Sequence, residues 1–439
     1  MAGDGVPNGW RLVKLGDLGE VNRGRSRHRP RYAEHLYGGP YPFIQTGDIK
    51  SSGGRITAYQ QTYSEAGLAQ SRMWPTGTLC ITIAANIAET GILTFPACFP
   101  DSVIGFVPDA SKCDTRFVEY TFRYLRHQIQ NEASGSVQDN INLQTIDRLR
   151  FPLPSLSEQR AIAHILGTLD DKIELNRRMS ETLEAMARAL FKSWFVDFDP
   201  VRAKAEGRDP GLPQPLADLF PARLVHSELG EIPEGWEVGS LADVAEQLRD
   251  SENPMQSPDV VFEHFSLPAY DEGQWPKHEV GENIKSLKWR VPAGVVLLSK
   301  LNPEIERVWL VDVRPGDRAI CSTEFLVLAP RRPHGRCYLY CLACSPSVRK
   351  NLEGLVTGTS KSHQRAQVGS ILGLTVVKPP RPLLSRFENA AEPLLARVLE
   401  CRRESRTLAV LRDTLLPKLI SGELRVQDAE KFIEGLSDG

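Results

Sequence analysis

Five arginines occupy alternate positions near the start of the chain, and their spacing suits phosphate binding. They are Arg23, Arg25, Arg27, Arg29 and Arg31, with His28 among them. Because side chains alternate between the two sides of an extended chain, this period places all five guanidinium groups on one side. Such a row can bind nucleic-acid phosphates through charge and bidentate hydrogen bonds. A solvated surface loop without a ligand is the alternative interpretation.

Two polar loops carry residue types that read the edges of bases. The first loop, 135–140, contributes Ser136, Gln138 and Asn140, and the second, 358–365, contributes Ser360, Lys361, His363, Gln364 and Arg365. Asn, Gln and Arg side chains form bidentate hydrogen bonds with adenine or guanine. We predict that both loops contact DNA, with polar surface turns as the alternative. Gln45 is a weaker candidate, because the nearby Asp48 repels phosphate.

The sequence carries no complete motif for catalysis or cofactor binding. Residues 358–362 lack the Gly-Lys-Ser/Thr core of a phosphate-binding loop, and Asn302-Pro303-Glu304 departs from the Asn-Pro-Pro-Tyr motif of amino-methyltransferases after two residues. A dinucleotide-binding Gly-x-Gly-x-x-Gly after a strand and a hydrolase Gly-x-Ser-x-Gly are also missing. We therefore predict neither a catalytic residue nor a cofactor of its own.

A group of cysteines raises the question of a metal site. Cys337, Cys341 and Cys344 lie at the helical spacing i, i+4 and i+7, with His334 nearby. Cysteines on one helix face are typical of a buried core, and a structural zinc usually needs a second pair of ligands. We therefore predict no metal site.

The chain repeats its own sequence. Pro7-Asn8-Gly9-Trp10 is echoed by Pro233-Glu234-Gly235-Trp236, 226 residues later. Three further pairs follow in the same order: 74–79 with 291–296, 135–136 with 358–359, and 151–154 with 377–380. Chance matching of common turn residues is the alternative, but four echoes in one order favour a duplicated plan.

Each half begins with a mixed part of strands and helix. Runs of β-branched and aromatic residues bounded by turn residues predict strands, and apolar residues near one face predict helices. The expected strands are 56–59, 78–83, 103–107, 295–298 and 324–328, and the expected helices are 116–132 and 337–355.

A long helix is expected after each mixed part. Ser155 and Glu158 have the spacing of a capping box, and Gly422 suits a helix end. Apolar residues then recur at alternating steps of three and four, which predicts a coiled-coil seam. The seam comprises Leu166, Leu169, Ile173, Asn176, Leu183 and Leu190 in the first helix and Leu394, Val398, Leu408 and Leu415 in the second. Arg412 does not fit this register, and Pro393 is expected to break or kink the second helix.

The polar members of the two seams favour an antiparallel pair. Asn176 and Ser180 lie near the middle of the first seam, and Cys401 and Ser405 near the middle of the second. Middle then meets middle, and the internal repeat suggests a twofold axis that reverses direction. Between the halves, the stretch 200–232 is rich in proline and glycine and is predicted to be a linker.

The order mixed part, long helix, mixed part, long helix resembles the DNA-specificity (S) subunit of type I restriction-modification systems. Similar stretches are 43–49, 152–159, 173–178, 191–198 and 411–419. The resemblance covers nearly the whole chain and is weakest in the second mixed part, where Pro-Leu-Pro…Glu-Gln has become Pro379-Pro380…Phe387-Glu388.

The resemblance implies an α+β fold with two mixed α/β target-recognition domains, separated by two long helices in an antiparallel coiled coil with pseudo-twofold repetition. The expected parts are domains 1–154 and 233–381, spacers 155–199 and 382–425, linker 200–232 and tail 426–439. Each domain would read half of an asymmetric, bipartite site on double-stranded DNA. The helices would set the separation and dock two modification subunits that carry the methyl transfer and its S-adenosylmethionine. Restriction subunits can join them, and this chain would have no catalysis of its own.

Composition agrees with such a protein. Lys and Arg number 53 and Asp and Glu 55, a formal net charge of −2, which excludes a uniformly basic protein but not local basic patches. No secretory signal begins the chain, no apolar run approaches a membrane span, and 8 cysteines are too few for a disulfide scaffold. We expect a cytoplasmic location without membrane contact.

Two rival classes have distinct signatures. A nuclease or methyltransferase with a degenerate motif would show activity of the isolated chain with metal or S-adenosylmethionine. A coiled-coil scaffold without sequence specificity would bind DNA in a salt-sensitive manner, with no preference among sequences.

Overall fold

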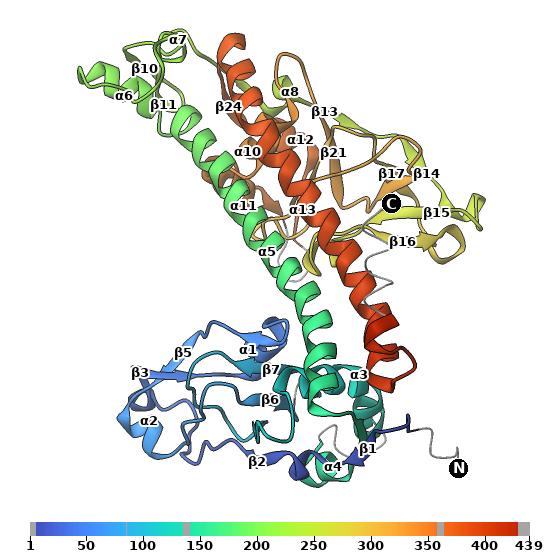
Figure 1. Cartoon of the computed structure of the whole chain (residues 1–439). Helices are drawn as coiled ribbons and strands as arrows, with labels where there is room; N and C mark the ends of the chain where they lie inside the picture. Colours follow the sequence, from blue (N-terminus) through green and yellow to red (C-terminus); the bar gives the residue numbers. More distant parts are fainter. Residues whose placement is uncertain (1–5, 85, 135–140, 358–363, 429–439) are drawn as a thin grey trace. The chain divides into compact units, whose positions relative to one another are not determined.

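The chain folds into two compact units. The computed structural model describes residues 6–84, 86–134, 141–357 and 364–428 (Figure 1). Unit 1 comprises residues 1–175 and 405–439, and unit 2 comprises residues 176–404. Two long helices, α5 (Leu156–Phe195) and α13 (Arg381–Ser421), contribute to both units.

A five-stranded sheet with one adjacent long helix forms the core of unit 1. The strands in spatial order are β2 (Gly19–Arg23), β8 (Val103–Pro108), β6 (Leu79–Thr82), β7 (Thr90–Leu93) and β4 (Arg55–Ile56). All four residues of the central β6 are buried, as expected where both faces of a strand are covered. The helix α3 (Thr115–Ser134) buries Phe117, Phe122 and Ile129 in the same core.

Smaller elements complete unit 1. The remaining strands are β1 (Arg11–Val13) paired with β9 (Phe151–Leu153), and β3 (Tyr37–Phe43) paired with β5 (Gln61–Tyr63). The short helices are α1 (Thr46–Ser51), α2 (Glu65–Ala69) and α4 (Leu143–Arg148).

Unit 2 contains the same frame, which confirms the internal repeat. Its strands β13 (Ala245–Leu248), β21 (Phe325–Pro330), β18 (Val296–Ser299) and β19 (Val308–Leu310) follow the spatial order of β2, β8, β6 and β7. The register agrees as well, since Gly19 pairs with Pro108 and Ala245 with Pro330. The pair β12 (Glu237–Ser240) and β24 (Thr375–Lys378) corresponds to β1 and β9.

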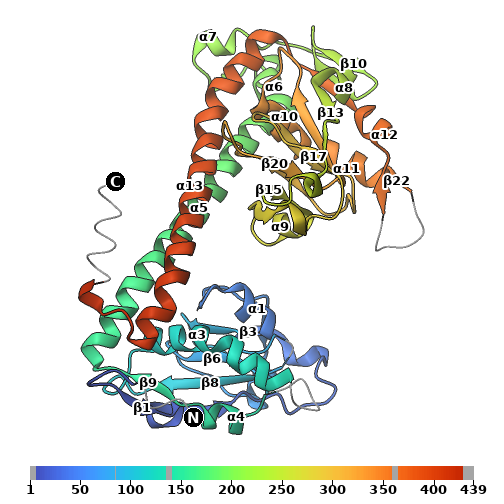
Figure 2. The same cartoon turned by 90° about the vertical axis from the view of Figure 1, so that its right-hand side faces the viewer.

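A second sheet distinguishes unit 2 from unit 1. Its spatial order is β14 (Ser251–Glu252), β17 (Lys288–Arg290), β20 (Ala319–Cys321), β15 (Val261–Phe265) and β16 (Lys277–Val280). The short helix α9 (Leu267–Asp271) follows β15 (Figure 2). This sheet was not predicted from the sequence.

The prediction of a single helix over residues 337–355 is wrong. Two helices, α10 (Arg336–Ala343) and α11 (Pro346–Gly354), replace it because Pro346 begins a new helix and the Ser345 hydroxyl accepts the Val348 amide hydrogen as its cap. The remaining elements of this region are α8 (Leu241–Val244), β22 (Val356–Thr357), β23 (Arg365–Ala366) and α12 (Val368–Leu372).

The proline-rich stretch 200–232, predicted to be a linker, forms regular elements within unit 2. It forms α6 (Asp199–Ala205), α7 (Gln214–Ala217) and the hairpin of β10 (Leu224–Ser227) and β11 (Gly230–Pro233). Val201 and Phe220 are buried in the core of unit 2. The Lys204 ammonium group donates to the carbonyl oxygens of Ala217 and Phe220, both at 2.6 Å.

The long helices pair in opposite directions within each unit, as the fold prediction required. In unit 1, Leu166 near the start of α5 shares a core with Leu415 near the end of α13. In unit 2, the ring of Phe191 near the end of α5 lies 5.7 Å from that of Phe387 near the start of α13. Residue numbers therefore rise along one helix as they fall along the other.

Only some residues of the predicted coiled-coil seam are fully buried. Leu166, Leu169, Asn176, Val398 and Leu415 are buried, whereas Ile173, Leu183, Leu190, Leu394 and Leu408 are half-buried. Leu395 rather than Leu394 is buried at the start of α13. Pro393 does not break α13, and Gly422, with φ of 75°, follows its last residue as expected.

Candidate nucleic-acid interface

The arginine row of Arg23, Arg25, Arg27, Arg29 and Arg31 extends from the end of β2. The backbone amides of Gly24 and Arg25 donate to the carbonyl oxygens of Val103 and Phe99, at 2.8 and 3.1 Å. Gly24 and Ser26 are buried, while Arg23, Arg25 and Arg27 are exposed. The alternation predicted from the sequence is therefore present over residues 23–27.

Gly24 makes this anchoring possible. A Cβ atom at this position would lie 2.3 Å from the Pro100 carbonyl oxygen and 2.4 Å from that of Phe99. Any side chain would therefore push the row away from its anchor. The close approach of two backbone segments explains why glycine separates the first two arginines.

The five arginines differ in the contacts that they already make within unit 1. Asp101 accepts Arg31 Nη2 at 3.0 Å through its carboxylate and Arg23 Nε at 2.9 Å through its carbonyl oxygen. Arg29 donates to the carbonyl oxygens of Ser26 and His28. Among the described residues, the side chains of Arg25 and Arg27 have no hydrogen-bond or ion-pair partner.

The polar-loop candidates divide into two groups. Ser136, Gln138, Asn140, Ser360, Lys361 and His363 lie outside the described residues. The Gln364 carbonyl oxygen accepts the Asn302 amide hydrogen, and the Gln364 amide donates to the Asn302 side-chain oxygen at 3.2 Å. Arg365 donates two hydrogen bonds to Glu324, at 3.1 and 2.8 Å. Arg365 is thus already engaged within unit 2.

Gln45 is also committed locally. Its side chain donates to Gln61, and its backbone amide donates to the Asp48 carboxylate at 2.8 Å. Asp48 is therefore part of the start of α1, where a carboxylate is favourable.

Each unit fastens its helix to the long-helix pair with the same set of contacts, which we call the latch. In unit 1, the Tyr120 hydroxyl of α3 donates to Asp170 of α5 at 2.7 Å, and Asp170 also accepts from Arg412 of α13 at 2.7 Å. In unit 2, Tyr340 of α10 donates to Glu184 of α5 at 2.7 Å, and Glu184 accepts from Arg402 of α13 at 2.8 Å.

The latch was missed in the sequence, although Arg412 signalled it. A charged residue at a seam position predicts a partner on the facing helix, because a guanidinium group is not buried without one. Burial alone would lower the pKa of Arg412, and the hydrogen bond to Asp170 raises it instead. The apparent misfit in the coiled-coil register is therefore a structural contact.

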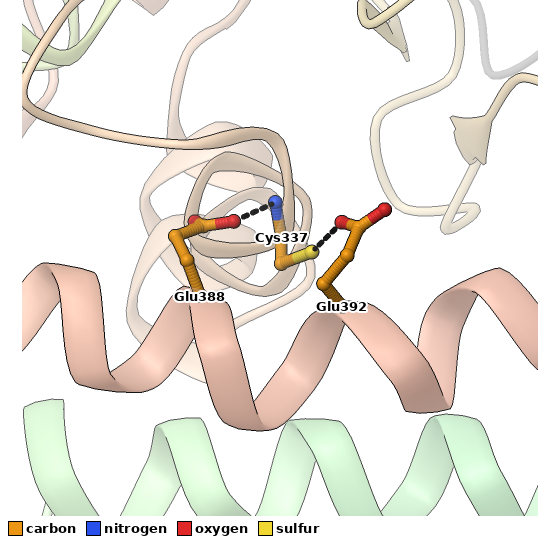
Figure 3. Close-up of side chains that lie close together, drawn as sticks. All are labelled: Cys337, Glu388 and Glu392. Atoms are coloured by element: carbon orange, nitrogen blue, oxygen red, sulfur yellow. Dashed lines mark hydrogen bonds between the residues drawn. The ribbon is translucent and has the colours of Figure 1, made fainter.

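A second shared device caps the helix that follows each sheet. The Gln159 side chain of α5 accepts the Asp114 amide hydrogen at 2.9 Å, one residue before α3 begins. The Glu388 carboxylate of α13 accepts the amide hydrogen of Cys337 (Figure 3). It also accepts the amide hydrogen of Tyr338, so it caps the first turn of α10. Glu388 thus has in unit 2 the capping role that Gln159 has in unit 1.

Cys337, Glu388 and Glu392 lie close enough together to hold a metal ion. Each of these side chains already has a hydrogen-bond partner within the protein. The Cys337 thiol donates to Glu392 at 2.8 Å (Figure 3). Arg336 donates to the same carboxylate at 3.0 Å. Burial raises the pKa of the Cys337 thiol and of the Glu388 carboxyl. These contacts attach α10 to α13, and we assign them no ligand.

The predicted capping box at the start of α5 is only half formed. Ser155 Oγ accepts the Glu158 amide hydrogen at 3.3 Å. The Glu158 carboxylate instead accepts from the Trp10 indole at 3.1 Å and from Arg425 at 2.8 Å. This carboxylate therefore joins residues near the two ends of the chain to unit 1.

Two copies of one sheet-and-helix frame, each latched to paired long helices, define a class of protein with two recognition modules and a helical spacer. Comparisons with known proteins identify the class. Residues 7–185 match the family model described as the type I restriction modification DNA specificity domain. Along nearly its whole length, the chain is similar to specificity subunits of type I restriction-modification systems.

Relatives support the assignment over the whole length. A type I restriction enzyme specificity subunit of Methanocaldococcus jannaschii is 24% identical over 438 residues, covering 96% of this chain and 95% of that protein. One from Haemophilus influenzae is 26% identical, covering 67% and 73%. The crystal structure of an S subunit from M. genitalium has the same fold, with a TM-score of 0.57, 13% identity and coverage of 96% and 98%.

These relatives are named specificity subunits of type I restriction enzymes. Within the described residues, none of the helices combines the length and apolar character needed to cross a membrane.

Proposed function

We propose that this chain directs a type I restriction-modification complex to a bipartite, asymmetric site on double-stranded DNA. Unit 1 reads one half-site and unit 2 the other. The observation that carries the proposal is the repeated frame, latched in each unit to α5 and α13 by a tyrosine, a carboxylate and an arginine. A symmetric homodimer would read a palindrome, whereas two different modules on one chain read different half-sites.

The partners follow from the family. Two modification subunits carry the methyl transfer and bring S-adenosylmethionine, and restriction subunits join them where they are made. In this assembly, the arginine row anchors unit 1 to phosphates, through Arg25 and Arg27 in particular. The remaining predicted contacts, including those of Ser136, Gln138, Asn140 and the 358–365 loop, belong to the same proposal.

An exchange of recognition modules tests the function. Residues 1–150 are replaced by those of a related specificity subunit, and the chain is produced together with its modification subunit. Methylated bases are then mapped across the host genome. We expect one half-site to change and the other to remain. Altered bases in both half-sites, or no bipartite site with the natural chain, would contradict the proposal.

The paired helices are the ruler between the half-sites in this proposal. At 1.5 Å per residue, four extra residues lengthen a helix by about 6 Å, nearly two base pairs of B-DNA. Insertion after Ser180 and after Cys401 keeps the antiparallel register, because Cys401 contacts Met179. We expect the methylated site to gain spacer length with unchanged half-sites. Insertion in one helix only is the control, and it should abolish methylation. A doubly extended chain that modifies only the original spacing would exclude the ruler.

A further inference from the structure

A charged hollow of about 610 Å³ lies in unit 2, beyond the end of β13. Its charged lining comprises Arg249, Asp250, Glu252, Arg290, Asp317 and Arg318. None of these residues was singled out in the sequence, because they come from three separate segments. The second sheet brings them together: Ser251 pairs with Trp289 and Arg290 with Ile320.

Glu252 organises the hollow. Its carboxylate accepts from Arg290 Nε at 2.6 Å and from Arg318 Nη2 at 2.9 Å, and only 11% of this side chain is exposed. Burial alone would raise the pKa of Glu252, but the hydrogen bonds from the two arginines keep it below its ordinary value. A buried carboxylate thus fixes two half-exposed guanidinium groups in place, which we call the Glu252 cluster.

The two arginines are held to different degrees. Arg290 also donates to Asp250 at 3.3 Å, so its groups are occupied on two sides. The Arg318 side chain has Glu252 as its one hydrogen-bond partner among the described residues, and its guanidinium carbon lies 5.3 Å from the centre of the Phe262 ring. Glu252 and Phe262 therefore hold the Arg318 side chain in position, and its remaining N–H groups can donate to a ligand.

The internal repeat places the Glu252 cluster where unit 1 has its arginine row. The strands β2 and β13 occupy the same edge position in the same register, and Arg23 ends β2. At the offset of 226, Arg23 corresponds to Arg249, the first residue after β13. Because the two modules share one frame, we expect the region at the end of β2 in unit 1 and the region just after β13 in unit 2 both to approach DNA.

The arginine row and the Glu252 cluster differ in charge. The hollow is lined by three arginines and three acidic residues, which balance. A neutral surface is a poor anchor for phosphates, whose binding depends on net positive charge. Reading of base edges requires fixed donors and acceptors instead, and a guanidinium group matches guanine N7 and O6 while a carboxylate accepts from cytosine N4.

We propose that the Glu252 cluster reads a G·C base pair in the half-site of unit 2. Arg318 donates to guanine and is the specificity-determining residue. Glu252 and Arg290 are positioning residues. The exposed Asp250 carboxylate accepts from the cytosine amino group. The proposal rests on the proposed function and names a residue and the base pair that it recognises.

The test uses the chain assembled with its modification subunit and genome-wide mapping of methylated sites. The module exchange at residues 1–150 first assigns the half-site of unit 2, which must contain a defined G·C pair. Arg318→Ala should then lower the preference for that pair roughly 5- to 150-fold. The other base positions of the same half-site and the whole half-site of unit 1 should stay unchanged. Glu252→Gln should relax the same position to a smaller degree.

Two further variants make the outcome unambiguous. Arg314→Ala removes an exposed arginine four residues away, outside the hollow, and should retain the natural site. Arg318→Lys keeps the charge but loses the bidentate geometry, so it should also relax specificity. It replaces Arg318→Ala if that variant does not fold.

Each result has a defined meaning. Uniform loss of affinity with a flatter salt dependence would make Arg318 a phosphate contact, and a natural site profile for Arg318→Ala would remove it from the interface. Either outcome overturns the proposal. If the natural chain directs methylation to no bipartite site at all, the proposed function fails instead.

Discussion

The two units are attached to the long helices in the same way, but they differ in the charged residues at the end of the equivalent edge strand. Both latch the helix behind the sheet to the long-helix pair through a tyrosine and an acid, Tyr120 with Asp170 and Tyr340 with Glu184. At the end of the equivalent edge strand, however, unit 1 presents an excess of arginine and unit 2 a balanced cluster around Glu252. A duplicated module can thus keep its attachment while its exposed corner acquires a different chemistry.

Each latch acid accepts from a tyrosine and two arginines, but the arginines differ in their other partners. Asp170 accepts from Tyr120, Arg412 and Arg123, and Glu184 accepts from Tyr340, Arg402 and Arg188. Arg123 also pairs with Glu119, Arg412 with Asp413 and Arg188 with Glu306. Arg402 is only 15% exposed and has Glu184 as its one ion-pair partner among the described residues. Loss of the acid therefore leaves more uncompensated charge in unit 2.

Glu184→Ala is expected to have the largest effect, because it leaves the Arg402 guanidinium group without an acid. Removing one partner of a buried ion pair costs about 3 kcal/mol or more, which corresponds to a hundredfold or greater loss of local protection. Hydrogen exchange measured by mass spectrometry should accelerate in α10 and in α13 around Arg402, but not in α3. Asp170→Ala is the matched variant, and it should show a weaker acceleration confined to α3 and its contacts. Equal acceleration in both units for either variant would mean that the latches do not act separately.

The arginine row and the Glu252 cluster should differ in salt dependence. Replacing Arg25 and Arg27 by Ala should weaken binding to cognate and random DNA alike, and it should lower the slope of log affinity against log salt by up to about 0.9 for each lost contact. Arg318→Ala should leave that slope nearly unchanged. Binding titrations at several salt concentrations measure both. An unchanged slope with lost sequence preference for the Arg25 and Arg27 variant would reverse the two assignments.

The sequence was sufficient to predict features that depend on local periodicity. Alternation of exposed and buried residues over 23–27 and the apolar seam around Leu166, Leu169 and Leu415 follow from side-chain direction alone. The repeat predicted the shared frame because equivalent strands fill equivalent places. Proline and glycine content misled at 200–232, where Val201 and Phe220 supply a buried face that composition does not reveal.

Features that depend on long-range pairing were out of reach. Glu252, Arg290 and Arg318 converge only through the register of β14, β17 and β20, and a shift by one residue would point them to the opposite face. Glu158 has the spacing of a capping residue, yet Trp10 and Arg425 compete for its carboxylate. Spacing identifies a residue's local options, and tertiary partners decide among them.

The smallest expected effect concerns the polar layer of the helix pair in unit 2. Asn176 is fully buried, donates to Glu404 at 2.8 Å, and its side-chain oxygen has no hydrogen-bond partner among the described residues. The partnered Asp170 layer of unit 1 carries no such deficit. Asn176→Leu removes an unsatisfied acceptor but also a partner of Glu404, so we expect stabilisation of up to about 1 kcal/mol. Buried polar residues can fix coiled-coil register at a cost in stability, so the same variant should loosen the spacing between methylated half-sites. Slower hydrogen exchange around residue 176, together with a broadened range of spacer lengths, would establish that role. A destabilised chain with unchanged spacing would show instead that Asn176 contributes hydrogen bonding and does not fix the register.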